Sequence, residues 1–300
     1  MTEHLLIKAN TKETIPDTNE RSPVLPKNTD LSLVCFTLLI QSAIGLIWVG
    51  TTASILTDAK SLGHAFTALA LIALGLASSL SHLARPRQAP NALRNLAASW
   101  LSREVLLVHL FGGAVFLIIP ASLLTGSTGR IVVEFAACIL GATALFAMTR
   151  VYLLKTVPVW KSPATSLEFT GSALLLGGAV AALLIAFKSG QSLFKMEMTA
   201  AGIAIFLGLV LKVMAMPLAF SARKAADDQT WYKLSAPYFS IGRIWAFRMG
   251  LNLTGLLLLP IAIGGDGLNG AGACLCLLCF VIGEIVGRLH FYNAYTRIGL

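Results

Sequence analysis

The sequence predicts an all-α, polytopic membrane protein, a bundle of eight transmembrane helices with both termini on the same side. Of its 300 residues, 56% are hydrophobic and only 12% are charged, whereas about a quarter of the residues in a typical soluble domain are charged. Apolar runs of roughly 20 residues, each long enough to span a bilayer, recur along the chain. Because lipid offers no hydrogen-bond partners to the backbone, such runs are expected to be helices.

The first four expected spans follow a polar tail. Residues 1–30 are polar and of mixed charge, and they lack the apolar core of a secretory signal. The first span is Leu31–Leu56, closed by the turn TDAKSLG, and the second, His64–Leu83, ends in a long polar loop. The third is Val105–Leu124, closed by TGSTGR, and the fourth, Ile131–Leu154, runs into a loop with two prolines.

The last four spans complete the bundle. The fifth is Leu167–Phe187, and the sixth is Met198–Phe220, with Lys212 inside it and a second long polar loop after it. The seventh, Arg243–Ile263, is followed by the turn GGDGLNG, and the eighth, Ala271–Tyr292, by a short basic tail. The expected organisation is therefore an N-terminal tail over residues 1–30 and one eight-helix membrane domain over residues 31–300.

The long polar loops fall on the side of the two termini, and most lysines and arginines lie there too; we call this side the basic end. The net charge of +9 thus reflects topology and contacts with lipid headgroups or a partner, not nucleic acid. Positive residues normally stay cytoplasmic, so charge alone would place both termini inside.

The loop Ser81–Glu104 joins the second and third spans at the basic end and contains the leading candidate site. His82 ends the second span, and Glu104 begins the third. Histidine exchanges protons near neutral pH, and a histidine and a carboxylate at one membrane level could share the protons of a two-electron oxidation. Both residues also fit plain structural roles, His82 bonded to the last helix carbonyls and Glu104 favoured by the helix dipole.

Other ionisable residues lie close to the spans. Glu284 and Arg288 are four residues apart, so they share a helix face and could form an ion pair. Gly283 and Gly287 have the GxxxG spacing that permits close packing on a neighbouring helix.

No metal site or haem is expected. The cysteines all fall inside apolar segments, where small buried thiols are typical, so we place no disulfide, zinc or iron–sulfur site among them. His64 and His82 share a helix face about 27 Å apart, so they could serve only two separate haems with partners from other helices. The five cysteines are Cys35, Cys138, Cys274, Cys276 and Cys279.

A transporter or permease is the alternative of a different class. Transporters often have repeated halves and helices broken near the membrane midplane. This sequence has no convincing repeat, and its charged residues gather at one face rather than at the centre of the spans. These features favour the interpretation as a proton-accepting redox subunit.

Four segments resemble the membrane anchor subunit of bacterial dimethyl sulfoxide reductase and its relatives. They are SHLARPRQAPNALRNL leading to WLSREVL, then MTRVYLLKTVPVW, SIGRIWAFRMGL and GEIVGRLHFY. Together with the eight spans they cover most of the sequence outside the N-terminal tail.

The resemblance implies a function. Such anchors hold a four-cluster iron–sulfur subunit and a molybdopterin catalytic subunit, oxidise menaquinol in anaerobic respiration, and carry neither haem nor an iron–sulfur cluster. The protein would then be a non-catalytic anchor of the bacterial inner membrane with a quinol-oxidising site. His82 and Glu104 match the family's quinol-site histidine and glutamate, as proton acceptors. The full expected quinone site is His82, Arg87, Glu104, Arg150 and Tyr152.

The resemblance also bears on orientation. Since electrons must reach the iron–sulfur partner, the quinol site and the docking face coincide at the basic end. In relatives with an exported catalytic unit this end is periplasmic, against the charge count, so the compartment stays open.

Overall fold

The structure is a computed structural model that describes residues 28–58, 60, 62–81, 93–154, 157–187, 194–227, 238–263 and 269–293. Within these ranges the regular structure is helical, with no strand, and eight helices are long and apolar enough to cross a membrane. The all-α, eight-span prediction is confirmed. The helices are α1 Asn28–Thr57, α2 Leu62–Ser81, α3 Trp100–Leu124, α4 Ser127–Tyr152, α5 Pro163–Ala186, α6 Phe194–Asp227, α7 Tyr238–Ile263 and α8 Asn269–Tyr292.

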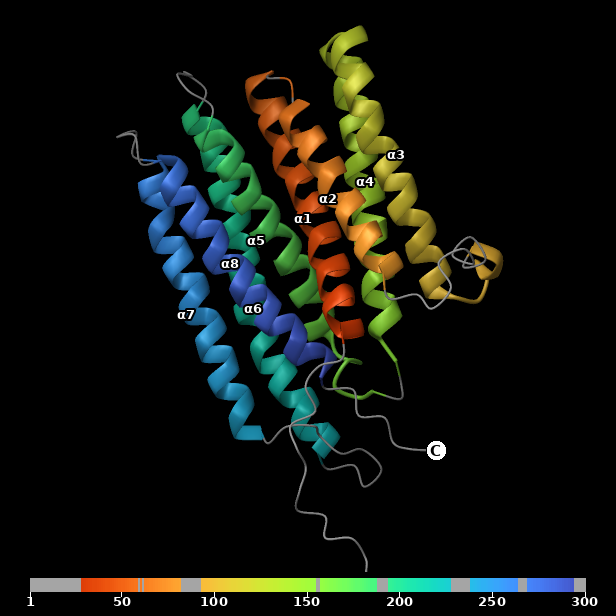
Figure 1. The fold of residues 1–300 in the computed structure, drawn as a ribbon, viewed down its shortest axis with the longest axis vertical. Helices are drawn as coiled ribbons and strands as arrows, with labels where there is room; N and C mark the ends of the chain where they lie inside the picture. Colours follow the sequence, from red (N-terminus) through yellow and green to blue (C-terminus); the bar gives the residue numbers. More distant parts are fainter. Residues whose placement is uncertain are drawn as a thin grey trace, which may run out of the picture.

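The helices run alternately up and down, so that the start of α1 and the end of α8 lie at the same end of the bundle (Figure 1). This places the described ends of the protein on one side, as predicted, and that side is the basic end. Two groups of four helices, α1–α4 and α5–α8, stand next to each other, and they are joined chiefly by α1 packing on α5.

The centre of the bundle is the contact between α1 and α5. The most apolar window of α1 is 78% buried and that of α5 is 67% buried, against 39% or less for the other spans. Glycines let these two backbones approach closely, since a Cβ on Gly177 would overlap the backbone of Gly45. Small residues at helix contacts are typical of membrane bundles, where packing rather than the hydrophobic effect drives association.

Several helices extend beyond the apolar runs. α3 begins at Trp100, because the side chain of Ser99 caps the helix by accepting a hydrogen bond from the backbone N–H of Ser102. α6 continues to Asp227, and α1 already begins at Asn28, inside the expected tail. The sequence prediction followed hydrophobicity, whereas a helix continues into the interface as long as its backbone hydrogen bonds and caps are satisfied.

We call the end of the bundle opposite the basic end the plain end. A buried arginine there connects two helices. Arg130 of α4 is 4% exposed and lies 2.7 Å from Asp58, which follows α1. It also lies 3.8 Å from Glu134, one turn along α4. The charged groups at this end thus tie the α1–α2 turn to α4.

Candidate functional site

The structure brings together some of the predicted site residues. His82 and Arg87 lie outside the described residues. Glu104 in α3 and Tyr152 at the end of α4 are both buried, at 2% and 7% exposure, and lie close enough to interact electrostatically. Arg150 is exposed, and its guanidinium lies 4.9 Å from the centre of the Trp100 ring. Glu104 and Tyr152 therefore form the described core of the predicted site.

Glu104 is held in an environment that a carboxylate does not normally occupy. It lies in the second turn of α3, the helix that Ser99 caps, and is one of the buried residues of that helix. Its Oε1 is buried and has no hydrogen-bond partner among the described residues. An unpaired buried carboxylate is costly, so such a group gains from a proton or from a ligand that donates a hydrogen bond.

Two tyrosine hydroxyls lie within electrostatic reach of Glu104. The hydroxyl of Tyr292 in α8 is 3.1 Å from that of Tyr152 and 3.3 Å from the Oγ1 of Thr37 in α1. Tyr292 also lies within electrostatic reach of Glu104. This line of hydroxyls joins α4, α8 and α1 at the basic end, and its groups are able both to donate and to accept hydrogen bonds.

An aromatic cluster surrounds Tyr152. Trp160 stacks on Phe291 with ring centres 5.1 Å apart, and its indole N–H donates to the Phe291 carbonyl at 2.8 Å. Tyr152 packs on Trp160, Phe169 and Phe291 with ring centres 5.4 to 5.5 Å apart. The segments MTRVYLLKTVPVW and GEIVGRLHFY, which carry much of the family resemblance, are therefore in direct contact.

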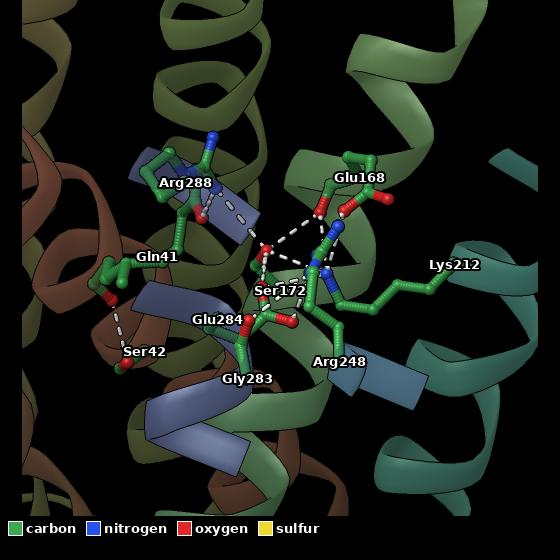
Figure 2. A network of polar contacts seen from close by, with 10 residues as sticks. Gln41, Ser42, Glu168, Ser172, Lys212, Arg248, Gly283, Glu284 and Arg288 are labelled. Atoms are coloured by element: carbon green, nitrogen blue, oxygen red, sulfur yellow. Dashed lines mark hydrogen bonds and ion pairs between the residues drawn. The ribbon is translucent and has the colours of Figure 1, made fainter. Parts of the chain in front are cut away.

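A buried network of charges is the feature that the sequence analysis missed (Figure 2). Lys212 of α6 is 0% exposed, and its Nζ donates to Glu284 Oε2 at 2.8 Å and to Glu168 Oε2 at 3.1 Å. Arg248 of α7 donates to Glu168 Oε2 at 3.0 Å and lies 3.6 Å from Glu284 Oε1. Each of α5, α6, α7 and α8 thus contributes one charged side chain to the same point.

Polar side chains extend this network into α1. Ser172 of α5 donates to Glu284 Oε2 at 2.5 Å and accepts from Lys212 at 3.1 Å. Arg288 of α8 donates to the amide oxygen of Gln41 in α1 at 2.7 Å and to Ser172 at 3.4 Å. Its guanidinium lies 4.0 Å from the centre of the Phe169 ring. The network therefore reaches the aromatic cluster as well.

Two glycines in α8 leave space for side chains of α7, including that of Arg248. A Cβ on Gly287 would overlap the guanidinium group of Arg248, and a Cβ on Gly283 would lie 2.9 Å from the side-chain oxygen of Asn252. The prediction that this GxxxG face packs closely on a neighbour is confirmed, and the neighbour is α7. The absence of a side chain at Gly287 is what lets Arg248 reach Glu168.

Two expectations from the sequence need correction. Glu284 bonds to Lys212 and Arg248 on other helices, while Arg288, its expected i, i+4 partner, bonds to Gln41. The charged residues also do not gather only at one face, since those of the network are buried about one to four turns inside the helix ends. The signal was present in the sequence, because each of the last four spans contains a charge, which is costly in a membrane.

A cavity of about 90 Å³ opens beside the network, at the basic end of α5–α8. Its lining includes Glu168, Phe169, Arg223, Trp245, Arg248 and Phe291. Phe169 and Phe291 also pack on Tyr152. The cavity and Tyr152 therefore share the side chains of Phe169 and Phe291.

Within the described ranges, His, Cys, Asp and Glu side chains form no group of three or more that could hold a metal ion. The five cysteines are free thiols.

Comparison with known proteins identifies the family. The family model for the DMSO reductase anchor subunit (DmsC) matches residues 27–294. The chain belongs to the DmsC family. It is therefore a multi-pass membrane anchor of the DMSO reductase type, and the family name implies a complex with other subunits.

The curated relatives agree with this family. The protein is 26% identical over 285 residues to the C subunit of the anaerobic dimethyl sulfoxide reductase of Haemophilus influenzae, and the match covers 90% of this protein and 96% of the relative. It is 27% identical over 279 residues to the YnfH subunit of an anaerobic dimethyl sulfoxide reductase of Escherichia coli, covering 89% and 95%. The family match, rather than the position of the charges, supports the anchor over the transporter.

Proposed function

We propose that this DmsC-family protein is the quinol-oxidising anchor of a molybdoenzyme complex in the bacterial inner membrane. It takes electrons from menaquinol and passes them to a four-cluster iron–sulfur subunit, which serves a molybdopterin catalytic subunit. Menaquinone is the exchangeable product, and the acceptor clusters belong to the partner. Membership of the DmsC family and the eight spans support this proposal.

The observation that carries the proposal is the buried Glu104, whose Oε1 lacks a hydrogen-bond partner among the described residues and which lies near the Tyr152–Tyr292 hydroxyl pair. A quinol hydroxyl would donate to this oxygen and so relieve its isolation. Oxidation releases two protons and two electrons from the quinol. Glu104 takes one proton and His82 the other, while the electrons leave one at a time to the partner's nearest cluster.

The remaining predicted residues have supporting roles in this proposal. The Tyr152 hydroxyl offers a hydrogen bond to a ring oxygen next to Glu104. Arg87 or Arg150 polarises a quinone oxygen and steadies the developing charge. The exposed position of Arg150 beside Trp100 suits a residue at the rim of the site rather than at its centre.

The test is Glu104→Gln in the assembled complex, which keeps the shape of the side chain but removes its ability to accept a proton. Quinol-driven turnover should fall by at least about 10²-fold, as expected for loss of a general base, while turnover driven by an artificial dye stays unchanged. Glu134→Gln is the matched control, since Glu134 is also buried but lies near the plain end. Wild-type quinol turnover in Glu104→Gln would refute the role of Glu104.

A further inference from the structure

We propose that the cavity between α5, α6, α7 and α8 binds the ring of a quinone or quinol before it reaches Glu104. The inference rests on the quinol chemistry proposed above, and it adds a second binding position with its own residues. Three features of the cavity carry it: its place in the bundle, its unused hydrogen-bonding groups and its aromatic walls.

The cavity has walls on both α6 and α7, which are consecutive helices. α6 packs extensively on α5, and α7 on α8, but α6 and α7 contact each other far less. The walls of the cavity include Met216, Ala219 and Phe220 from α6 and Trp245 from α7. In this proposal a molecule dissolved in the bilayer enters the cavity sideways, between α6 and α7.

The cavity has hydrogen-bond donors that the protein does not use. The indole N–H of Trp245 has no hydrogen-bond partner in the described part of the protein. Arg288 also lines the cavity. It makes both of its side-chain hydrogen bonds to the described residues through Nη2, so Nε and Nη1 donate to none of them. Carbonyl oxygens of an oxidised quinone ring would accept from such groups.

An unused acceptor lies in the same space. Glu168 is 22% exposed although it lies within the bundle, and it lines the cavity. Lys212 and Arg248 both bond to its Oε2, which leaves Oε1 without a donor among the described residues. A quinol ring donates hydrogen bonds through its hydroxyls, and Glu168 Oε1 can accept one of them. Trp245 and Arg288 can instead donate to the carbonyl oxygens of the quinone.

The walls fit a flat aromatic ring. Phe169, Phe220, Trp245 and Phe291 all line the cavity, and aromatic rings pack favourably face to edge or offset on one another. Its polar lining, which includes Glu168 and Trp245, offers an acceptor and a donor to the two oxygens of such a ring. Because Phe169 and Phe291 pack on Tyr152 as well, a ring in the cavity would contact two side chains that also contact Tyr152.

The first test fills the cavity. Ala219→Phe adds a ring on the α6 wall, and Ala204→Phe is the matched control, since Ala204 lies on the same helix and lines an apolar cavity near the plain end. The holo-complex is placed in vesicles of phosphatidylethanolamine and phosphatidylglycerol with increasing quinol content. Ala219→Phe should raise the quinol KM by about 10-fold or more with dye-driven turnover unchanged, whereas Ala204→Phe should match the wild type.

The second test locates the ring directly and does not depend on turnover. An azido-quinone is photoactivated in the holo-complex, and mass spectrometry identifies the labelled peptides. We expect label on peptides of α6, α7 or α8 that line the cavity, with a loss of about 2- to 10-fold in Trp245→Phe, which removes one hydrogen-bond donor but keeps the aromatic wall. This variant decides the matter if Ala219→Phe does not assemble.

The outcomes separate this inference from the proposed function. Label at the cavity that persists in Glu104→Gln supports the inference even if Glu104 has no role in turnover. Label confined to α3 and α4, or phospholipid retained in the cavity in place of the quinone, would overturn it. Equal KM changes in Ala219→Phe and Ala204→Phe would overturn it as well, because the effect would then be a general one of packing.

Discussion

Lys212 shows how strongly a single residue is constrained in this bundle. Its ammonium group is fully buried and satisfied by Glu168, Glu284 and Ser172. Lys212 and Arg248 are the two cations that pair with Glu168 and Glu284. Removing Lys212 therefore leaves the two carboxylates with Arg248 as their only directly bonded cation among the described residues. A buried pair contributes little net stability when it is intact, but breaking it exposes an uncompensated charge to a low dielectric.

Lys212→Met should therefore lower the free energy of unfolding by about 3–5 kcal/mol. Thermal unfolding in detergent, followed by intrinsic fluorescence, measures this. Lys195→Met is the control on the same helix, where the lysine is exposed and the change should stay within about 0.5 kcal/mol. Adding Glu284→Gln to Lys212→Met should restore part of the loss. Unchanged stability in Lys212→Met alone would show that the network does not hold the four helices.

His82 is the residue whose role depends most on resemblance, because it lies outside the described residues. His82→Phe should lower quinol-driven turnover by at least about 10²-fold while dye-driven turnover persists, since phenylalanine accepts no proton. His109→Phe is the matched control, because His109 is exposed, one turn beyond Glu104, with its ring bonded to the Val105 carbonyl. Equal losses in both variants would argue for a general defect in assembly.

At the scale of helices, the contact between α1 and α5 depends on residues without side chains. A Cβ on Gly177 would lie against the backbone of Gly45, which cannot turn away as a flexible side chain could. The two helices would have to separate along the most buried seam of the bundle.

Gly177→Ala should destabilise the protein by about 1–3 kcal/mol, the usual cost of overpacking a core. Gly113→Ala is the control, since a Cβ there meets nothing within 4 Å, and alanine is the better helix former by about 1 kcal/mol. Unfolding in detergent compares the two variants with the wild type. Equal stability of both would contradict the close α1–α5 contact.

Helices were predictable from sequence to the extent that hydrophobicity defines them. The eight spans follow from the apolar runs of the sequence. An even number of spans places both termini on the same side. Helix ends were less predictable, because Ser99 starts α3 by a cap that hydropathy does not detect. Partners across helices were not predictable: Glu284 bonds to Lys212 72 residues away, and only the arrangement of α5–α8 brings them together. Glu104 could be predicted as a site residue from its place at the start of a span and from the family resemblance. The lack of a hydrogen-bond partner for its Oε1 could not be predicted.

At the scale of the whole molecule, the two groups of four helices divide the chemistry. Glu104 and Tyr152 lie in α1–α4, and the charge network with its cavity lies in α5–α8, with Phe169, Phe291 and Tyr292 between them. Both features lie toward the basic end of the bundle, which is where the iron–sulfur partner is proposed to dock.

Purification of the tagged protein from its native membranes should therefore bring both iron and molybdenum with it. Elemental analysis of the purified complex measures the two metals, with an unrelated tagged protein from the same membranes as the control. A protein that purifies alone and free of both metals would contradict the proposed partners.

Gly287 has a consequence beyond packing. A single methyl group there would occupy the place of the Arg248 guanidinium and so displace a charge from the membrane interior without altering any charged residue. The effects of substitutions at positions 248 and 287 should therefore not add up. Once either residue is substituted, the bonds of Arg248 are lost, and substitution of the other causes little further loss of stability. In a mutational scan, Gly287 would therefore tolerate substitution as poorly as the charged residues of the network do.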